Sequence, residues 1–304
     1  MGRALPHGRS LLHVQGNMKK IVVIGAAGGY GAQDQACQDG PEVIRSFDFL
    51  EQIEESGIPY HWAGIVHLRR DGRDALSSVL EMCTLLAEET SKAVSAGHFP
   101  IVLGGDHSCA IGTWSGVKSA MAGRLGLIWI DAHMDSNTFE TSPTLAIHGM
   151  PLACLLGHGE EKLTRISTPS SKLLPQDICL IGVRSFEQGE AALLERLGVR
   201  IYFMEEIRRR GANAVLKEAL AIAGKETEGF GISIDLDALD PMEEPGVGSP
   251  VPGGMLKEEL VHALEQLRSE PKFIALEIVE YNPYRDEKFA TARAVSDLIE
   301  AVAP

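Results

Sequence analysis

The sequence predicts an α/β fold in which a central, mostly parallel sheet of about eight strands is covered by helices. From Lys19 onward, short apolar runs alternate with longer amphipathic runs, which is the pattern of parallel strands joined by crossover helices. Several apolar runs have no polar face, as expected for strands that are buried on both sides. The chain has 304 residues, is 44% hydrophobic and contains no long linker, so we expect one large domain.

The elements follow from these patterns in chain order. We expect strands at residues 21–24, 62–67, 101–104, 125–130, 178–183, 199–203, 231–234 and 273–278. Helical periodicity covers residues 74–96, 190–197 and 213–223. A fourth helix is expected where Leu256, Leu260, Leu264 and Leu267 repeat at helical spacing. Long irregular segments at residues 25–40, 135–148 and 240–254 follow strand ends and are candidate site loops.

Residues 1–17 are basic and Gly-rich and lack acidic side chains. We interpret them as an extension, which is disordered, transit-like or left from expression, or as sequence that precedes a true start at Met18. The predicted domain therefore spans residues 18–304. It has no apolar stretch of the roughly 18 residues that a membrane helix needs, and we expect a cytoplasmic protein.

The charge balance narrows the class of partner. The formal net charge is −14, which argues against nucleic acid because phosphate binding requires Lys and Arg. An acidic field favours a cationic small molecule. The simpler alternative is that the acidity only keeps the protein soluble, and charge alone favours that alternative.

The five cysteines are widely spaced and form no Cys-x-x-Cys pair. Disulfides and a thiolate zinc site are therefore not expected. Cys154 lies in an apolar run and is interpreted as a core residue, while Cys109 lies close enough to His107 to be considered as a nucleophile. No basic group is tied to Cys109 by local spacing, which disfavours that role.

Acidic and histidine side chains cluster just after four of the predicted strands. The clusters are His107, Asp131-x-His133-x-Asp135, Asp235-x-Asp237 and Glu280. Residues two apart on an extended segment point to the same side, and the carboxyl ends of parallel strands form the ligand-binding edge of such sheets. These patterns together predict a metal site.

The ligand types indicate which ions would bind. Four aspartates and two histidines suit Mn²⁺ better than a thiolate-seeking metal, although Zn²⁺, Fe²⁺ and Co²⁺ also accept such ligands. Six ligands are too many for one ion unless some bridge two. Two ions about 3.5–4 Å apart can share a bridging water and lower its pKa toward neutrality, which makes hydroxide the nucleophile.

These motifs resemble those of the arginase/agmatinase family, the ureohydrolases. The resemblance rests on Gly-Gly-Asp-His-Ser at 104–108, Asp-Ala-His-Met-Asp at 131–135, Ser-Ile-Asp-Leu-Asp-Ala-Leu-Asp-Pro at 233–241 and Glu-Tyr-Asn-Pro at 280–283. It extends over nearly the whole chain from Met18, and Asp39-Gly40-Pro41 is similar to an early element of the family. The resemblance implies a three-layer α/β/α fold and a subunit of a homo-oligomer, either a trimer or a hexamer.

The resemblance also implies two Mn²⁺ ions per subunit and their ligands. One ion would bind His107, Asp131, Asp135 and Asp235, and the other would bind Asp131, His133, Asp235 and Asp237. Asp131 and Asp235 would bridge the two ions. Asp106 would stay outside, where it orients neighbouring groups or caps the following helix.

The implied reaction is hydrolysis of a carbon–nitrogen bond in a guanidinium group. A metal-bridging hydroxide would attack the guanidinium carbon, Asp135 would transfer a proton to the leaving amine, and Glu280 would pair with the guanidinium. Asn137 and His148 stand where arginases carry an Asn that contacts the substrate α-carboxylate and a His that shuttles protons.

The sequence departs from the arginase pattern in two places. Thr144 stands where arginases commonly have a Ser that contacts the carboxylate. Ser185 and Glu187 stand where the family usually has Asp-x-Asp, whose second Asp senses the α-amino group, so Glu187 keeps that charge on a longer side chain.

The leading prediction is a hydrolase that converts L-arginine and water to L-ornithine and urea. The alternatives are an agmatinase, a hydrolase of another guanidino or formimidoyl compound, and a non-catalytic binding protein of the same fold. The non-catalytic alternative is disfavoured because all six metal-ligand positions and Glu280 are present.

Overall fold

The computed structural model describes residues 19–68, 72 and 74–303, so the predicted extension at 1–17 lies outside the described residues. All eight predicted strands are confirmed, and their exact bounds differ from the expected ones by up to five residues. The strands are β1 (Ile21–Ala27), β2 (Tyr60–His67), β3 (Phe99–Leu103), β4 (Leu125–Ile130), β5 (Leu173–Val183), β6 (Arg200–Phe203), β7 (Gly229–Asp235) and β8 (Phe273–Val279).

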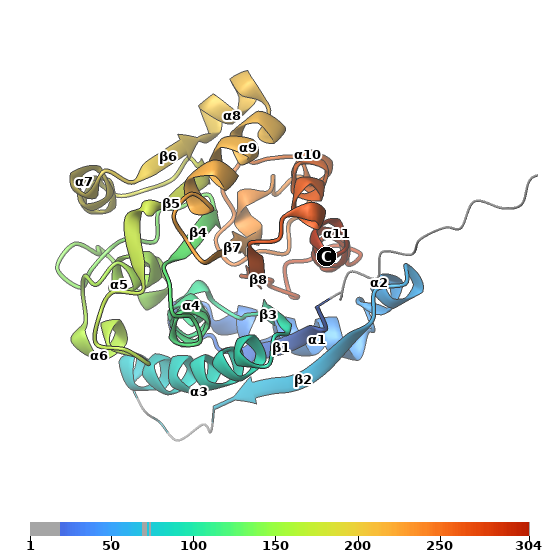
Figure 1. Cartoon of the computed structure of the whole chain (residues 1–304), viewed down its shortest axis with the longest axis horizontal. Coiled ribbons are helices and arrows are strands. Elements are labelled where there is room, and N and C mark those ends of the chain that lie inside the picture. Colours follow the sequence, from blue (N-terminus) through green and yellow to red (C-terminus); the bar gives the residue numbers. More distant parts are fainter. Residues whose placement is uncertain (1–18, 69–71, 73, 304) are drawn as a thin grey trace, which may run out of the picture.

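The eight strands form one sheet in which every neighbouring pair is parallel. Their order is β2-β1-β3-β8-β7-β4-β5-β6, so β2 and β6 are the two edges, at opposite ends of the sheet in Figure 1. The expectation of a mostly parallel sheet is thus confirmed, and the sheet is parallel throughout. Strands β3, β8, β7 and β4 occupy its centre.

The helices connect and cover these strands. They are α1 (Gly40–Ser46), α2 (Glu51–Glu55), α3 (Ala75–Ser95), α4 (Ala110–Ser119), α5 (Pro151–Leu155), α6 (Glu161–Thr164), α7 (Gln188–Leu197), α8 (Met204–Arg210), α9 (Ala212–Ala223), α10 (Lys257–Leu264) and α11 (Ala290–Val302). Five 3₁₀ turns accompany them: η1 (Gln35–Asp39), η2 (His107–Cys109), η3 (Ile147–Gly149), η4 (Leu236–Ala238) and η5 (Glu265–Ser269).

The four helices expected from periodicity are confirmed as α3, α7, α9 and α10 with η5. One detail was wrong. Leu256 was assigned to the apolar stripe of the last helix, but it precedes the first turn of α10 and its side chain is 44% exposed. The extended backbone at this N-cap position turns Leu256 away from the face that buries Leu260 and Leu264.

Alternation along the strands explains the two helical layers. In β4, Ile128 and Ile130 pack on one face in a cluster with residues of α9, α10 and α11. Their neighbours Leu127 and Trp129 point to the other face and pack with residues of α4 and α5. Side chains of successive strand residues point to opposite sides, so a fully apolar strand needs a helical layer on each face. Helix α3 covers the second face beside β1 and β3 (Figure 1).

The carboxyl ends of the four central strands lie at one edge of the sheet, and the polar clusters follow them. Gly104 and Gly105, just after β3, allow this edge to pack closely. A Cβ atom on Gly104 would overlap Cys109 and Val279, and one on Gly105 would overlap the backbone of Gly28. The two glycines therefore let the His107 segment approach both β8 and the loop after β1.

Within the described part of the chain, no helix combines the length and the apolar character that crossing a lipid bilayer requires.

Candidate metal centre and active site

A first cluster of potential ligands surrounds the Nδ1 atom of His107. This atom lies 3.2 Å from Asp131 Oδ2, 2.9 Å from Asp135 Oδ2 and 3.2 Å from Asp235 Oδ2. The four side chains come from the segments after β3 and β4 and from the last residue of β7, and all are buried. Their ligand atoms lie within 4.8 Å of one another, which is a suitable arrangement for holding one cation.

A second cluster lies beside the first and shares Asp131 with it. The Nδ1 atom of His133 lies 3.5 Å from Asp131 Oδ1 and 3.0 Å from Asp237 Oδ2. Asp131 thus directs one oxygen toward His107 and the other toward His133. This division is the geometry that a bridging carboxylate needs.

Asp235 belongs to the first cluster and not to the second, which consists of Asp131, His133 and Asp237. The physical reason is local. Asp235 caps η4, and its Oδ1 accepts a hydrogen bond from the Asp237 backbone N–H at 2.8 Å. Its Oδ2 faces His107. The expectation that Asp235 bridges two ions therefore stays a prediction.

Backbone and side-chain hydrogen bonds fix the shared carboxylate. Asp131 Oδ1 accepts from the His133 backbone N–H at 2.6 Å, and Oδ2 accepts from Trp129 Nε1 at 2.8 Å. Asp237 Oδ1 accepts from the Ala132 N–H at 3.1 Å, which ties the β4 and β7 segments together. The Arg184 guanidinium donates to the carbonyl oxygens of Asp237, Leu239 and Val251, so it holds the chain after β7 in place.

A buried chain of polar groups orients His107 from behind. His107 Nε2 lies 3.0 Å from Ser233 Oγ, and Ser233 Oγ donates to Glu277 Oε2 at 2.6 Å. Trp114 Nε1 donates to the same Glu277 oxygen at 2.9 Å. Because the Ser233 proton is directed at Glu277, its oxygen accepts from His107, which places the imidazole proton on Nε2 and leaves Nδ1 as a ligand atom. The Trp129 ring stacks on the imidazole with centroids 4.1 Å apart.

The side chains of both clusters fit divalent cations. Four buried aspartates outnumber the two histidines, and two buried atoms, His107 Nδ1 and Asp237 Oδ2, have no hydrogen-bond partner among the described residues. Unpaired buried polar atoms each destabilise a fold by about 1–3 kcal/mol. Burial raises the pKa of Asp235 well above its usual range, and the nearby Asp237 and Asp131 charges add to this effect. A cation among these oxygens would remove the repulsion, and oxygen and imidazole ligands suit a hard or borderline ion.

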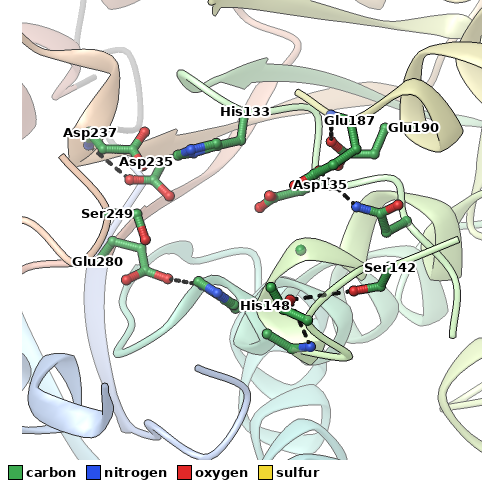
Figure 2. A pocket seen from close by; sticks show the side chains of 14 residues that line it. His133, Asp135, Ser142, His148, Glu187, Glu190, Asp235, Asp237, Ser249 and Glu280 are labelled. Carbon is green, nitrogen blue, oxygen red and sulfur yellow. Dashed lines mark hydrogen bonds and ion pairs between the residues drawn. The ribbon is translucent and has the colours of Figure 1, made fainter. Parts of the chain in front are cut away.

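The clusters open into a pocket of about 180 Å³. Its lining comprises His133, Asp135, Asn137, Ser142, Thr144, Ala146, His148, Gly149, Glu187, Glu190, Asp235, Asp237, Ser249 and Glu280. Figure 2 shows Asp235, Asp237, Ser249 and Glu280 at one side of this pocket, with Glu187 and Glu190 at the other. The pocket is therefore strongly acidic, which suits a cationic ligand with polar groups at both ends.

Glu280 is held in an unusual backbone conformation at the floor of the pocket. It follows β8 with φ of +65°, and its carboxylate is almost fully buried. Oε1 accepts from the His107 backbone N–H at 2.9 Å and lies 3.0 Å from His148 Nδ1 (Figure 2). Burial alone would raise the pKa of Glu280, but hydrogen bonding to His148 and to the His107 N–H holds it below its usual value. The carboxylate is thus a stable negative charge.

The remaining predicted pocket residues also lie in this lining. Asn137 Nδ2 donates to Glu187 Oε2 at 3.0 Å. Thr144 Oγ1 accepts from the Ala146 N–H at 3.2 Å and lies 3.4 Å from Ser142 Oγ. Eleven site positions were named from the sequence, and nine of them line this one cavity. The other two, His107 and Asp131, are buried ligands that lie behind it.

Three polar residues of the pocket lining were missed by sequence reasoning: Ser142, Glu190 and Ser249. Glu190 is buried, accepts from the Ser136 N–H at 3.2 Å, and has its pKa raised to about 9 by burial and by Glu187. The spacing Glu187-x-x-Glu190 at the start of a helix was an available signal for this pair. Ser142 and Ser249 carry no comparable local signal.

The predictions for Asp106 and for the cysteines can also be compared with the structure. Asp106 caps η2, accepting from the Ser108 N–H at 3.0 Å and from the Gly31 N–H at 2.9 Å, so its predicted capping role is confirmed. All five cysteines are free and buried, which confirms the expectation of no disulfides. Burial raises the pKa of the Cys109 thiol well above its usual range, which is unfavourable for a nucleophile.

Comparisons with known proteins identify the family. The model of the arginase family matches residues 19–303. The chain belongs to the arginase family. Arginase from Bacillus caldovelox is 42% identical over 284 residues, an alignment that covers 90% of this chain and 95% of that protein.

Solved arginase-family structures agree with this assignment. The crystal structure of arginase from Bacillus subtilis matches with a TM-score of 0.88 and 38% identity, covering 94% of this chain and 98% of that one. Entamoeba histolytica arginase, solved in complex with L-ornithine, matches with a TM-score of 0.86 and 29% identity over 94% and 98% of the two chains. The family resemblance and the arginase-like α/β fold expected from the sequence motifs are therefore confirmed.

Proposed function

We propose that this protein is an arginase that hydrolyses L-arginine to L-ornithine and urea. The observation that carries the proposal is the buried, negatively charged Glu280 facing an acidic pocket beside two adjacent ligand clusters. Relatives named arginases, at 38–42% identity over most of the chain, support it. The L-ornithine bound to the Entamoeba histolytica relative supports the proposed product.

Two Mn²⁺ ions per subunit are the proposed cofactors. His107, Asp131, Asp135 and Asp235 would hold one, and Asp131, His133 and Asp237 the other, with Asp235 as the further bridging ligand expected from the family. When bound, such a pair supplies a nucleophilic water at neutral pH. The oxygen-rich ligand set supports manganese over metals that prefer sulfur.

Glu280 is the residue that we assign to the guanidinium. A planar guanidinium and a carboxylate form paired, charge-assisted hydrogen bonds, which fix the plane of the cation. Oε1 of Glu280 already accepts two hydrogen bonds, so Oε2 is the oxygen with more capacity for the substrate. A guanidinium group paired with Glu280 would expose its carbon to attack by a water molecule that lies beside the two ligand clusters.

The proton transfers balance the reaction. Water adds to the guanidinium carbon as Asp135 accepts one of its protons, and Asp135 passes this proton to the side-chain nitrogen as the bond between that nitrogen and the carbon breaks. The second proton of the water moves from the departing urea oxygen to the amine. The products are urea and the ammonium group of ornithine. We assign to His148 the exchange of protons with solvent. Its position in the pocket lining supports this role, and so does its pKa, which burial lowers but the contact with Glu280 raises to about 9.

The α-amino and α-carboxylate groups of arginine would lie at the opposite side of the pocket. Glu187 carries the negative charge proposed to attract the α-amino group, and Asn137 and Thr144 are the proposed partners of the α-carboxylate. The contact between Asn137 and Glu187 supports this assignment, because it places the two recognition groups side by side.

A substrate panel tests the proposal. The Mn²⁺-loaded protein is assayed with L-arginine, agmatine, guanidinobutyrate and formimidoylglutamate, and the products are quantified. We expect L-arginine to have the highest kcat/KM, because it alone among these compounds carries both a free α-amino group for Glu187 and an α-carboxylate for Asn137 and Thr144. Turnover of another compound without urea release from L-arginine would overturn the assignment, and no turnover with metal bound would indicate a binding protein.

We also propose that the protein is a single domain from residue 18 that acts in the cytoplasm as a homo-oligomer, a trimer or a hexamer. The family resemblance supports the assembly, and the single continuous sheet supports the domain. Light scattering of the purified protein measures the assembly. A monomeric mass would contradict it.

A further inference from the structure

The carboxylate of Glu280 accepts a hydrogen bond from a buried thiol, that of Cys37. Cys37 Sγ lies 3.2 Å from Glu280 Oε2, with the thiol as donor. Cys37 is buried in η1, on the loop between β1 and α1. The two residues are 243 positions apart in the sequence, so this contact exists only because the fold brings the loop after β1 against the end of β8.

The two oxygens of Glu280 have different surroundings. Oε1 accepts from the His107 backbone N–H and faces His148 Nδ1, whereas the Cys37 thiol is the one donor to Oε2 among the described residues. A Cβ atom on Gly248 would overlap Oε2 and would also approach Cys37 Sγ to 3.1 Å. Gly248 and Cys37 thus pack closely against Oε2.

The thiol remains protonated and therefore remains a donor. Burial raises the pKa of Cys37 far above its usual range, and the adjacent Glu280 charge raises it further. The segment that carries Cys37 also packs closely against the chain after β8, because a Cβ atom on Gly40 would overlap the Tyr281 carbonyl. The contact between Cys37 and Glu280 therefore lies in a closely packed region.

We propose that Cys37 is a positioning residue that orients the Glu280 carboxylate for the guanidinium group of the substrate. The thiol occupies one lone pair of Oε2 and so directs the remaining one into the pocket. This inference rests on the proposed function. A hydrogen bond to a charged acceptor contributes more than a neutral one, and for a thiol donor we expect a loss of about five- to tenfold in kcat/KM when it is removed.

Cys37→Val and Cys37→Ser form the matched pair of variants. Valine fills a similar volume but has no donor, whereas serine keeps a donor. We expect Cys37→Val to raise KM for L-arginine about five- to tenfold with bound Mn²⁺ unchanged, and Cys37→Ser to stay within about twofold of the wild type. Cys179→Val, which removes a buried thiol in β5, should leave KM unchanged. A Cys37→Val protein with wild-type KM, or a Cys37→Ser protein as impaired as Cys37→Val, would overturn the proposal.

Two further measurements require no turnover. The S–H stretching band of Cys37, identified by its loss in Cys37→Ser, should shift to higher frequency in Glu280→Gln, because an amide oxygen is a weaker acceptor than a carboxylate. Methylguanidinium should bind Cys37→Val about fivefold more weakly than the wild type. A wild type that releases no urea from L-arginine would refute the proposed function alone. An unmoved S–H band, or equal binding of methylguanidinium, would refute the role of Cys37.

Discussion

The Ser233 hydroxyl connects a metal-ligating histidine to a buried carboxylate, and its removal is a direct test of how the first cluster is held. Ser233 Oγ lies 3.0 Å from His107 Nε2 and 2.6 Å from Glu277 Oε2, and all three side chains are fully buried. In Ser233→Ala, the His107 N–H loses its acceptor, and Glu277 keeps Trp114 as its principal donor. One unpaired donor and one lost charge-assisted hydrogen bond together destabilise the fold by about 2–4 kcal/mol.

The effect on metal binding follows from the same geometry. Without Ser233, the imidazole of His107 is free to change its tautomer or tilt, and loss of such an outer partner reduces metal affinity by roughly 10–100-fold. Equilibrium dialysis against Mn²⁺ measures the affinity, and urea titration measures the free energy of unfolding.

Ser115→Ala is the matched control for this experiment. The Ser115 hydroxyl is buried but has no hydrogen-bond partner among the described residues. Its removal should leave Mn²⁺ affinity unchanged and should not lower the free energy of unfolding. The reasoning is refuted if Ser233→Ala binds Mn²⁺ as tightly as the wild type, or if Ser115→Ala loses as much affinity.

Three other changes have defined outcomes. Glu280→Gln should lower kcat/KM for L-arginine about 100- to 1000-fold with bound Mn²⁺ unchanged, because a neutral amide cannot pair with the guanidinium charge; a loss below tenfold would contradict the assignment. Glu244 is buried with Oε2 unpartnered among the described residues, and burial raises its pKa to about 7. The Glu244 carboxyl group therefore binds a proton more tightly in the folded state than in the unfolded state. The stability that this protonation contributes is lost as pH rises from about 4.5 through 7. Thermal unfolding should show Glu244→Gln gaining about 1–3 kcal/mol relative to the wild type between pH 5 and pH 8. Glu243 is the exposed neighbour, and Glu243→Gln serves as the control because it should not gain stability over this pH range. An equal gain in the two variants would contradict the assignment of the effect to the buried Glu244 carboxyl group. Gly231→Ala should lower the free energy of unfolding by at least about 1–3 kcal/mol, because the new Cβ atom would overlap the Trp114 ring. An unchanged midpoint of urea denaturation would contradict this expectation.

The strands were predictable because burial on both faces leaves a strong local signal. β4 and β7 are buried along their whole length, and their apolar runs predicted them closely. The start of β5 was predicted late, at residue 178 and not Leu173, because Pro175, Gln176 and Asp177 interrupt the apolar run. Helices α4 and α5 were not predicted: α5 is buried throughout and α4 over most of its length, so neither has the polar face that reveals an amphipathic helix.

Site residues that follow strand ends were predictable from spacing, since Asp131, His133 and Asp235 lie where the topology gathers ligands. Contacts set by tertiary packing were not. The approach of Cys37 to Glu280 depends on how the loop after β1 packs, and no local pattern marks it. The assignment of Asp235 to one cluster depends on its capping of η4, a rotamer choice that spacing does not determine.

The number and position of bound metal ions test the central claim most directly. Crystals of the protein grown with Mn²⁺ would be measured by anomalous X-ray diffraction at the manganese edge. The account predicts two peaks per chain, one among His107, Asp131, Asp135 and Asp235, and the other among Asp131, His133 and Asp237. A single peak, or manganese bound elsewhere with these side chains unliganded, would contradict it.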